Sequence, residues 1–455
     1  MSGSAPIRRL ARRLVRRALL TVGAFALGVA LFLVDSIALG GPGPDPAKRA
    51  APGGTVAAAA PRGSQAELRA RLERVPGDWV AWAALGVTYL EQAGRSGDSS
   101  TLAQAEATFT ESLRVRPQDN PQALTGQAAL AAARNDFAAA AALATEATTI
   151  NAFNGTALGV LSDALVELGR YEEAAAALQS MTDLSGDSST LARIARLREL
   201  HGDTAGAQEA MERSLAGARS PAAAAYASFA LGELAFNAGD LTAAQSRYAE
   251  SRTRDPGHLP AVAGAAKVDA ARGNPIAAVT AYRGVVAASP LPHYATEFGD
   301  LLASLGRQDE AAQQYATAAA QIQLIRANGG NPDLAAALFA ADRGDPEEAL
   351  ALARREHAAR KSIHTDDALA WALHGVGRDS EALVLSDGAL RLGTRDASLH
   401  FHRGMIEAAL GLGPAATVSL ETALAINPHF STLHAPAARA QLDRLADAAR
   451  TGAAG

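Results

Sequence analysis

An alanine that returns about every 34 residues is the feature of this chain that most constrains its fold. Successive copies are 33 to 38 residues apart along the 455-residue sequence. Such a period indicates copies of one unit, each able to bury its apolar face only against its neighbours. The sequence therefore predicts one extended array instead of several unrelated domains. The ten positions are Ala105, Ala140, Ala174, Ala207, Ala244, Ala278, Ala311, Ala349, Ala382 and Ala416.

A second small residue precedes each of these alanines, by twelve positions in nine copies and by nineteen in the first. The ten are Gly86, Ala128, Ser162, Ala195, Gly232, Ala266, Gly299, Ala337, Ala370 and Gly404. Apolar residues make up 48% of the chain but aromatic residues only 5%, so alanine and leucine provide most of the packing. Both residue types favour helix. We therefore expect two helices per unit that cross closely, where a branched side chain would push them apart.

The first unit carries a more specific pattern, of the form W-x2-L-G-x2-Y, then A-x3-F, then P, on Trp82, Leu85, Gly86, Tyr89, Ala105, Phe109 and Pro117. This pattern resembles the tetratricopeptide repeat (TPR), whose period is 34 residues. The resemblance covers about Asp78 to Pro428. It implies an all-α, right-handed superhelical α-solenoid of about ten antiparallel helix pairs, with the first helices lining a concave groove.

The turns between the paired helices carry glycine, as in Gly169, Gly239, Gly306 and Gly344. Glycine there can end the first helix in a left-handed conformation, and a following aspartate, such as Asp240, can cap the second helix.

The N-terminal residues predict a membrane anchor. Residues 1–17 carry six arginines, and the apolar segment 18–40 is 23 residues long, which as a helix spans about 34 Å, enough for the bilayer core. The positive-inside bias places residues 1–17 in the cytoplasm and sends the repeats to the extracytoplasmic side. A cleaved signal peptide is the alternative, because Ser36-Ile37-Ala38 is a small-x-small site.

Beyond the anchor we expect three further parts. Residues 41–64 form a flexible linker rich in Gly, Pro and Ala, 65–428 form the repeat solenoid, and 429–455 form a capping helix and tail.

Composition and motifs argue against several classes of function. The net charge of -5 is modest, which predicts no nucleic-acid partner, and the absence of cysteine excludes thiolate zinc sites. The sequence contains no phosphate loop, no H-E-x-x-H and no nucleophile elbow. We therefore expect no enzyme, no cofactor, no metal and no small-molecule substrate.

The groove is the natural place to bind a partner. The position after each small residue of the first helix carries mixed charge in the central units, at Asp163, Arg196, Glu233, Lys267 and Asp300, and Phe229 lies one helical turn before Glu233. These charged residues either recognise a partner or belong to an ordinary solvated face.

Towards the C-terminus the same face turns apolar and aromatic, at Trp371, His374, Phe401 and Met405. These four either form a patch that takes an anchor of the partner or pack between neighbouring helices. The sequence thus predicts a non-enzymatic, membrane-tethered scaffold for a protein or peptide. The alternative is a secreted, chaperone-like binder of extended peptides.

Overall fold

Residues 63–96 and 100–452 are described by the structure, which is a computed structural model. Within these ranges the chain forms helices and no strand. The helices are α3 (Gln65–Arg74), α4 (Trp79–Ser96), α5 (Thr101–Val115), α6 (Pro121–Ala133), α7 (Phe137–Ile150), α8 (Gly155–Glu167), α9 (Tyr171–Leu184), α10 (Ser188–Leu200), α11 (Thr204–Ala216), α12 (Pro221–Asn237), α13 (Leu241–Arg254), α14 (Leu259–Ala271), α15 (Pro275–Ala288), α16 (Pro292–Ser304), α17 (Gln308–Ala327), α18 (Asp333–Arg343), α19 (Pro346–Ala359), α20 (Ile363–Gly375), α21 (Asp379–Ala389), α22 (Ala397–Ala409), α23 (Gly413–Ile426) and α24 (His434–Gly452).

The expected membrane segment, residues 18–40, and the basic residues 1–17 lie outside the described part of the chain. Among the helices that the structure does describe, none has the length and apolar character needed to cross a membrane.

The helices pair as the repeat predicts. From α4 with α5 to α22 with α23, each first helix packs along the helix that follows it, which gives ten pairs. Each of the ten recurring alanines lies buried on a second helix, and each small partner lies buried on a first helix. The prediction of a helical repeat array of about ten pairs is confirmed.

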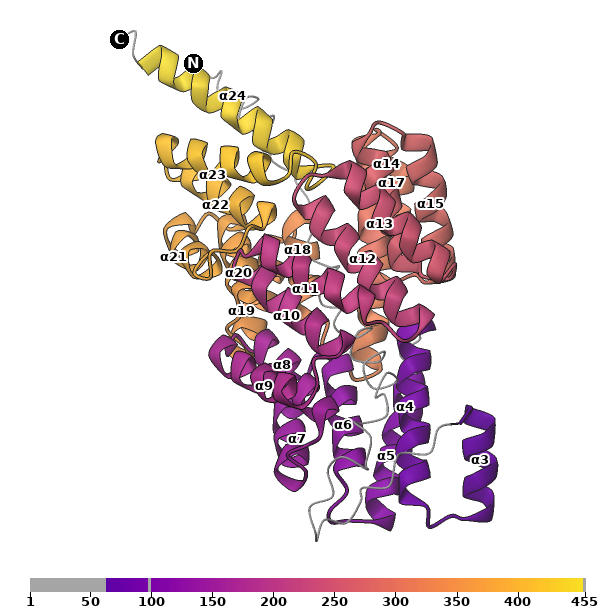
Figure 1. The fold of residues 1–455 in the computed structure, drawn as a ribbon. Helices are drawn as coiled ribbons and strands as arrows, with labels where there is room; N and C mark the ends of the chain where they lie inside the picture. Colours follow the sequence, from indigo (N-terminus) through magenta and orange to yellow (C-terminus); the bar gives the residue numbers. More distant parts are fainter. Residues whose placement is uncertain (1–62, 97–99, 453–455) are drawn as a thin grey trace.

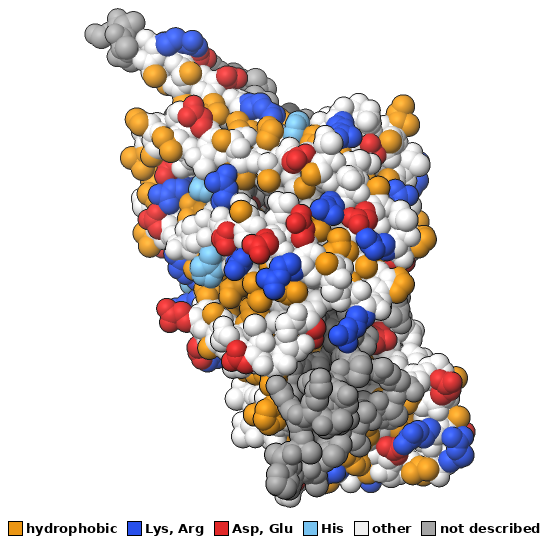
Figure 2. All heavy atoms as spheres, in the orientation of Figure 1, with side chains coloured by type: hydrophobic (Ala, Val, Ile, Leu, Met, Phe, Trp, Pro, Cys, Tyr) orange, Lys and Arg blue, Asp and Glu red, His pale blue; other side chains and the backbone are white. Residues whose placement is uncertain are grey.

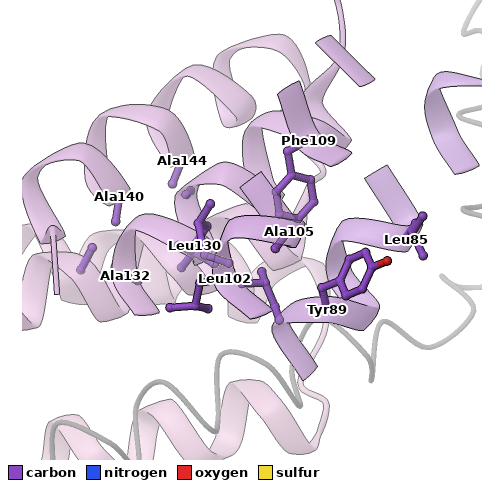
Figure 3. Packing of buried hydrophobic residues seen from close by; sticks show 14 of the residues in the cluster. Leu85, Tyr89, Leu102, Ala105, Phe109, Leu130, Ala132, Ala140 and Ala144 are labelled. Carbon is purple, nitrogen blue, oxygen red and sulfur yellow. The ribbon is translucent and has the colours of Figure 1, made fainter. Parts of the chain in front are cut away.

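The small residues are required because large rings pack against them. The ring of Tyr248 on α13 lies between Gly232 of α12 and Gly264 of α14, and a Cβ atom at either glycine would come within 2.5 Å of the ring. Phe109 on α5 is likewise enclosed by Gly86 and Gly126. Figure 3 shows Phe109 sharing one interior with Ala105 and Leu130.

The turns also have the expected conformation. Gly169, Gly239, Gly306 and Gly344 all adopt positive φ, between 75° and 85°. The Asp240 side chain accepts hydrogen bonds from the backbone N–H groups of Thr242 and Ala243, which otherwise lack partners at the start of α13.

The array winds until its C-terminal units lie on its N-terminal ones, and Figure 1 shows α19 and α20 beside α8. Arg360, between α19 and α20, donates from Nη1 to Oε2 of Glu167 at 2.6 Å, although 193 residues separate the two. Asn427 donates to the carbonyl of Phe236, 191 residues away, at 2.7 Å. Gly169 is pressed against the carbonyl of Lys361, which leaves no room for a side chain. One superhelical turn therefore takes about 190 residues.

The ends of the described array are covered by single helices. At the start α3 buries Leu68 and Leu72 against the first pair. At the end α24 buries Ala435 and Ala438 in a cluster that includes Leu420 of α23.

We predict that Gly232→Ala lowers the free energy of unfolding by about 1–3 kcal/mol, because the new methyl group overpacks the Tyr248 ring. Gly284 is the matched control, since it lies within α15 with open space around it, and Gly284→Ala should stabilise by about 0.5–1 kcal/mol. Denaturant titration measures both. Equal effects of the two substitutions would contradict the close crossing.

Candidate functional site

The first helices form the inner surface of the array. First helices of neighbouring pairs contact one another, as α6 does α8, α12 does α14 and α18 does α20. In the described part, second helices make no contact of similar extent with each other. In a curved array the more crowded side is the concave one, so the first helices line the groove.

Charged side chains on the inner surface are paired between neighbouring first helices. Arg193 lies 2.8 Å from Asp163, and Arg196 lies 2.5 Å from Glu167, both pairs joining α10 to α8. Further along, Lys267 of α14 lies 2.8 Å from Glu233 of α12. The solvated-face interpretation of these charges is therefore wrong, because most of them are buried or half-buried ion pairs that fix one unit on the next.

Tyrosines of the second helices reach the same carboxylates. Tyr248 donates to Glu233 at 2.5 Å, and Tyr315 donates to Asp300 at 2.9 Å. Asp300 also lies 2.8 Å from Arg343 of α18. These contacts link first helices to each other and to the second helices behind them.

Three carboxyl groups of this surface have raised pKa values. Burial raises the pKa of Asp300 to about 7, against the opposing charge of Arg343. Burial also raises the pKa of Glu199 to about 7 and raises the pKa of Glu297. Each of these groups would be stabilised in its charged form by an additional cation.

The four aromatic and apolar residues expected to form a groove patch do meet, but inside the core. Trp371 is 7% exposed and donates from Nε1 to Asp342 at 2.8 Å, and Phe401 is fully buried. The ring centroids of Trp371 and Phe401 are 5.9 Å apart. Neither side chain offers a surface to a partner, because residues of α18, α23 and α24 pack around them.

The other two members of that group are also engaged. His374 stacks on Trp371 with centroids 5.0 Å apart, and its Nδ1 lies 2.5 Å from Asp379. Met405 packs, partly buried, on the same cluster. Packing between neighbouring helices therefore accounts for all four positions, and the remaining candidates lie nearer the middle of the chain.

Two cavities open beside those remaining candidates. Phe229 and Glu233 line a small cavity of about 70 Å³ between α10 and α12, together with Glu199. Lys267 and Asp300 line a larger one of about 380 Å³. Each cavity adds an acidic residue that the sequence had not singled out, Glu199 and Glu297.

A sequence signal for these two acids existed. Glu199 follows Arg196 by three residues and Glu297 precedes Asp300 by three, so each shares a helical face with a predicted residue. In the two described ranges, no group of three or more His, Asp or Glu side chains is placed to hold a metal ion.

Comparisons with known proteins yield similar structures only. No protein-family model matches the chain, and no curated protein matches its sequence. The APC/C hetero-tetramer Cut9–Hcn1 matches over 84% of this chain and 92% of that chain, at 14% identity and a TM-score of 0.38. TTC0263, a thermophilic TPR protein of Thermus thermophilus, matches over 42% and 98%, at 21% identity and a TM-score of 0.37.

The human IFIT1 dimer with PPP-AAAA matches over 72% of this chain and 77% of that one, at 15% identity and a TM-score of 0.45. All three TM-scores lie under 0.5, so what these proteins bind carries no argument about this chain. The expectation of no nucleic-acid partner stays a prediction.

We predict that the free energy of unfolding of the Glu199→Gln variant, relative to that of the parent, increases as the pH rises. The folded protein holds the Glu199 proton more tightly than the unfolded chain, since the pKa rises from 4.5 to about 7. The contribution of this carboxyl group to stability is therefore full below pH 4.5 and is lost as the pH rises through about 7.

Urea denaturation at pH 5 and pH 8 measures the difference between variant and parent. That difference should shift in favour of the variant at pH 8. Glu172→Gln, at an exposed position on α9, should show no such shift. A difference for Glu199→Gln that is the same at both pH values would contradict the prediction.

Proposed function

We propose that this chain is a non-enzymatic scaffold that binds a protein or peptide partner on its inner surface and is tethered to a membrane by residues 18–40. The observation that supports the binding role most directly is the cavity of about 380 Å³ on that surface, lined by Lys267 and Asp300. Its volume falls in the range of roughly 300–1,000 Å³ in which proteins commonly bind ligands.

The charge distribution on one face of the molecule supports the same location. On the face seen in Figure 2, acidic and basic side chains are intermixed, with no broad field of one sign. A partner that is recognised by charge is therefore met locally, where the inner surface carries carboxylates with raised pKa values.

Binding is tested with the full chain in detergent and two matched variants. Phe229→Ala removes an aromatic side chain from the small cavity of about 70 Å³ on the inner surface, whereas Phe153→Ala removes one that is 78% exposed in the loop between α7 and α8. Phe229→Ala should weaken capture of a protein partner by about 2 kcal/mol if Phe229 is a binding hot spot, and Phe153→Ala should leave it unchanged.

Melting curves accompany this comparison, because Phe229 also packs on the rings of Tyr248 and His258. Undiminished capture by a folded Phe229→Ala variant, or capture of nucleic acid in place of protein, would contradict the proposal.

The tether predicts a topology. A membrane-impermeant label applied to intact cells should modify residues beyond Gly41, because the arginines of residues 1–17 keep that end in the cytoplasm. Protection of the repeats until the membrane is broken would contradict this orientation. Recovery of a shortened chain free of membranes would favour the cleaved, secreted alternative.

A further inference from the structure

The larger cavity lies where the last part of the chain closes over the middle of the array. Its walls come from α14 and α16 and from residues 428–432, the segment that joins α23 to α24. Figure 1 shows this segment beside α12 and α13, and the hydrogen bond from Asn427 to the Phe236 carbonyl holds it there. Neither half of the array contains this cavity alone.

Two carboxyl groups of α16, those of Asp300 and Glu297, line the cavity. Asp300 is 3% exposed, and while its Oδ1 accepts from Tyr315 and Arg343, its Oδ2 has no hydrogen-bond partner. Glu297, one turn earlier on α16, accepts a hydrogen bond from Tyr282 at 3.0 Å and has no basic residue in ion-pair contact within the described part.

The charge of Lys267 opposes the rise in the pKa of Glu297, but the hydrogen bonds of Lys267 go to another carboxylate. The Lys267 Nζ atom donates to both oxygens of Glu233, at 2.8 and 3.0 Å, and so is committed to the neighbouring helix. A buried carboxylate oxygen without a donor is costly, and a bound donor would remove that cost.

Much of the wall is apolar or aromatic, although His429 and Arg439 also line the cavity. Phe236, Leu301 and Phe430 all line the cavity and are buried. The same region already holds cations against rings, since Lys267 Nζ lies 4.9 Å from the Phe236 ring centroid and the Arg343 guanidinium lies 4.0 Å from that of Tyr315. An aliphatic stem with a planar cationic end matches both the walls and the floor.

We propose that this cavity binds an arginine side chain of the partner polypeptide, with its guanidinium group bridging Glu297 and Asp300. The two carboxylates lie three residues apart on one helix, about 5–6 Å between Cβ atoms. A guanidinium presents five donors in a rigid plane and can bridge that span, whereas an ammonium group is a compact point charge. This inference rests on the proposed function and names the chemistry of its anchor.

The test uses the full-length protein and a capped, fluorescein-labelled nonapeptide with one central arginine in a serine, glycine and leucine background. Matched peptides carry lysine, glutamine or glutamate at the centre. Fluorescence anisotropy should show the arginine peptide binding about tenfold more tightly than the glutamine peptide, with lysine between them, because a charged hydrogen bond adds about that factor. The glutamate peptide should bind least well.

Glu297→Gln should bring the arginine peptide close to the glutamine peptide, and Glu297→Lys should abolish arginine binding. Glu310→Gln, a partly exposed position on α17 whose partner is Arg307, is the control and should keep the arginine preference. Melting curves establish that each variant is folded.

Equal binding of the arginine and glutamine peptides would overturn this inference. An arginine preference that survives both Glu297 substitutions would overturn it as well. Neither result would contradict the scaffold function. Absence of binding by all four peptides would also overturn the inference. The scaffold function would be tested separately, by capture of the partner with the Phe229→Ala variant.

Discussion

The close crossing of the two helices in each unit is the constraint on which the rest of this structure depends. A glycine, alanine or serine on the first helix lets the second helix approach until a ring such as Tyr248 packs against the backbone of two first helices at once. Because every pair repeats this geometry, small rotations between pairs add up to a superhelix. The curvature that forms the inner surface is therefore a consequence of side-chain size at a few positions.

A second interaction converts that curvature into a site. After about 190 residues the array meets itself, and Arg360 is buried between Glu167 of the earlier turn and Glu356 of the preceding helix, α19. Removing one partner of such a buried ion pair commonly costs about 3–5 kcal/mol, since the other charge is left uncompensated. The same contact between turns, continued at Asn427, brings residues 428–432 over α14 and α16 and so encloses the larger cavity.

Local periodicity made the helix pairs predictable, because small residues, recurring alanines and turn glycines act over a few residues each. The contacts between turns join residues 191 to 196 apart and leave no periodic signal, so neither Arg360 nor the cavity could be foreseen. The charged series from Asp163 to Asp300 was located correctly on the inner helices, but its pairing was not predicted. For Trp371 and Phe401 the sequence left two alternatives, and packing holds because a groove-facing position near the end of the array becomes core once α24 covers it.

The proposed binding site for a polypeptide lies inside the array, against α14 and α16. Photo-crosslinking tests it most directly, with p-benzoylphenylalanine in place of Ser304, an exposed residue at the rim of the larger cavity, or of Gln313, an exposed residue on α17. Illumination with the arginine peptide bound should crosslink the peptide to the protein labelled at position 304 and leave position 313 unreacted. Crosslinking at 313 alone, or equally at both positions, would contradict the account.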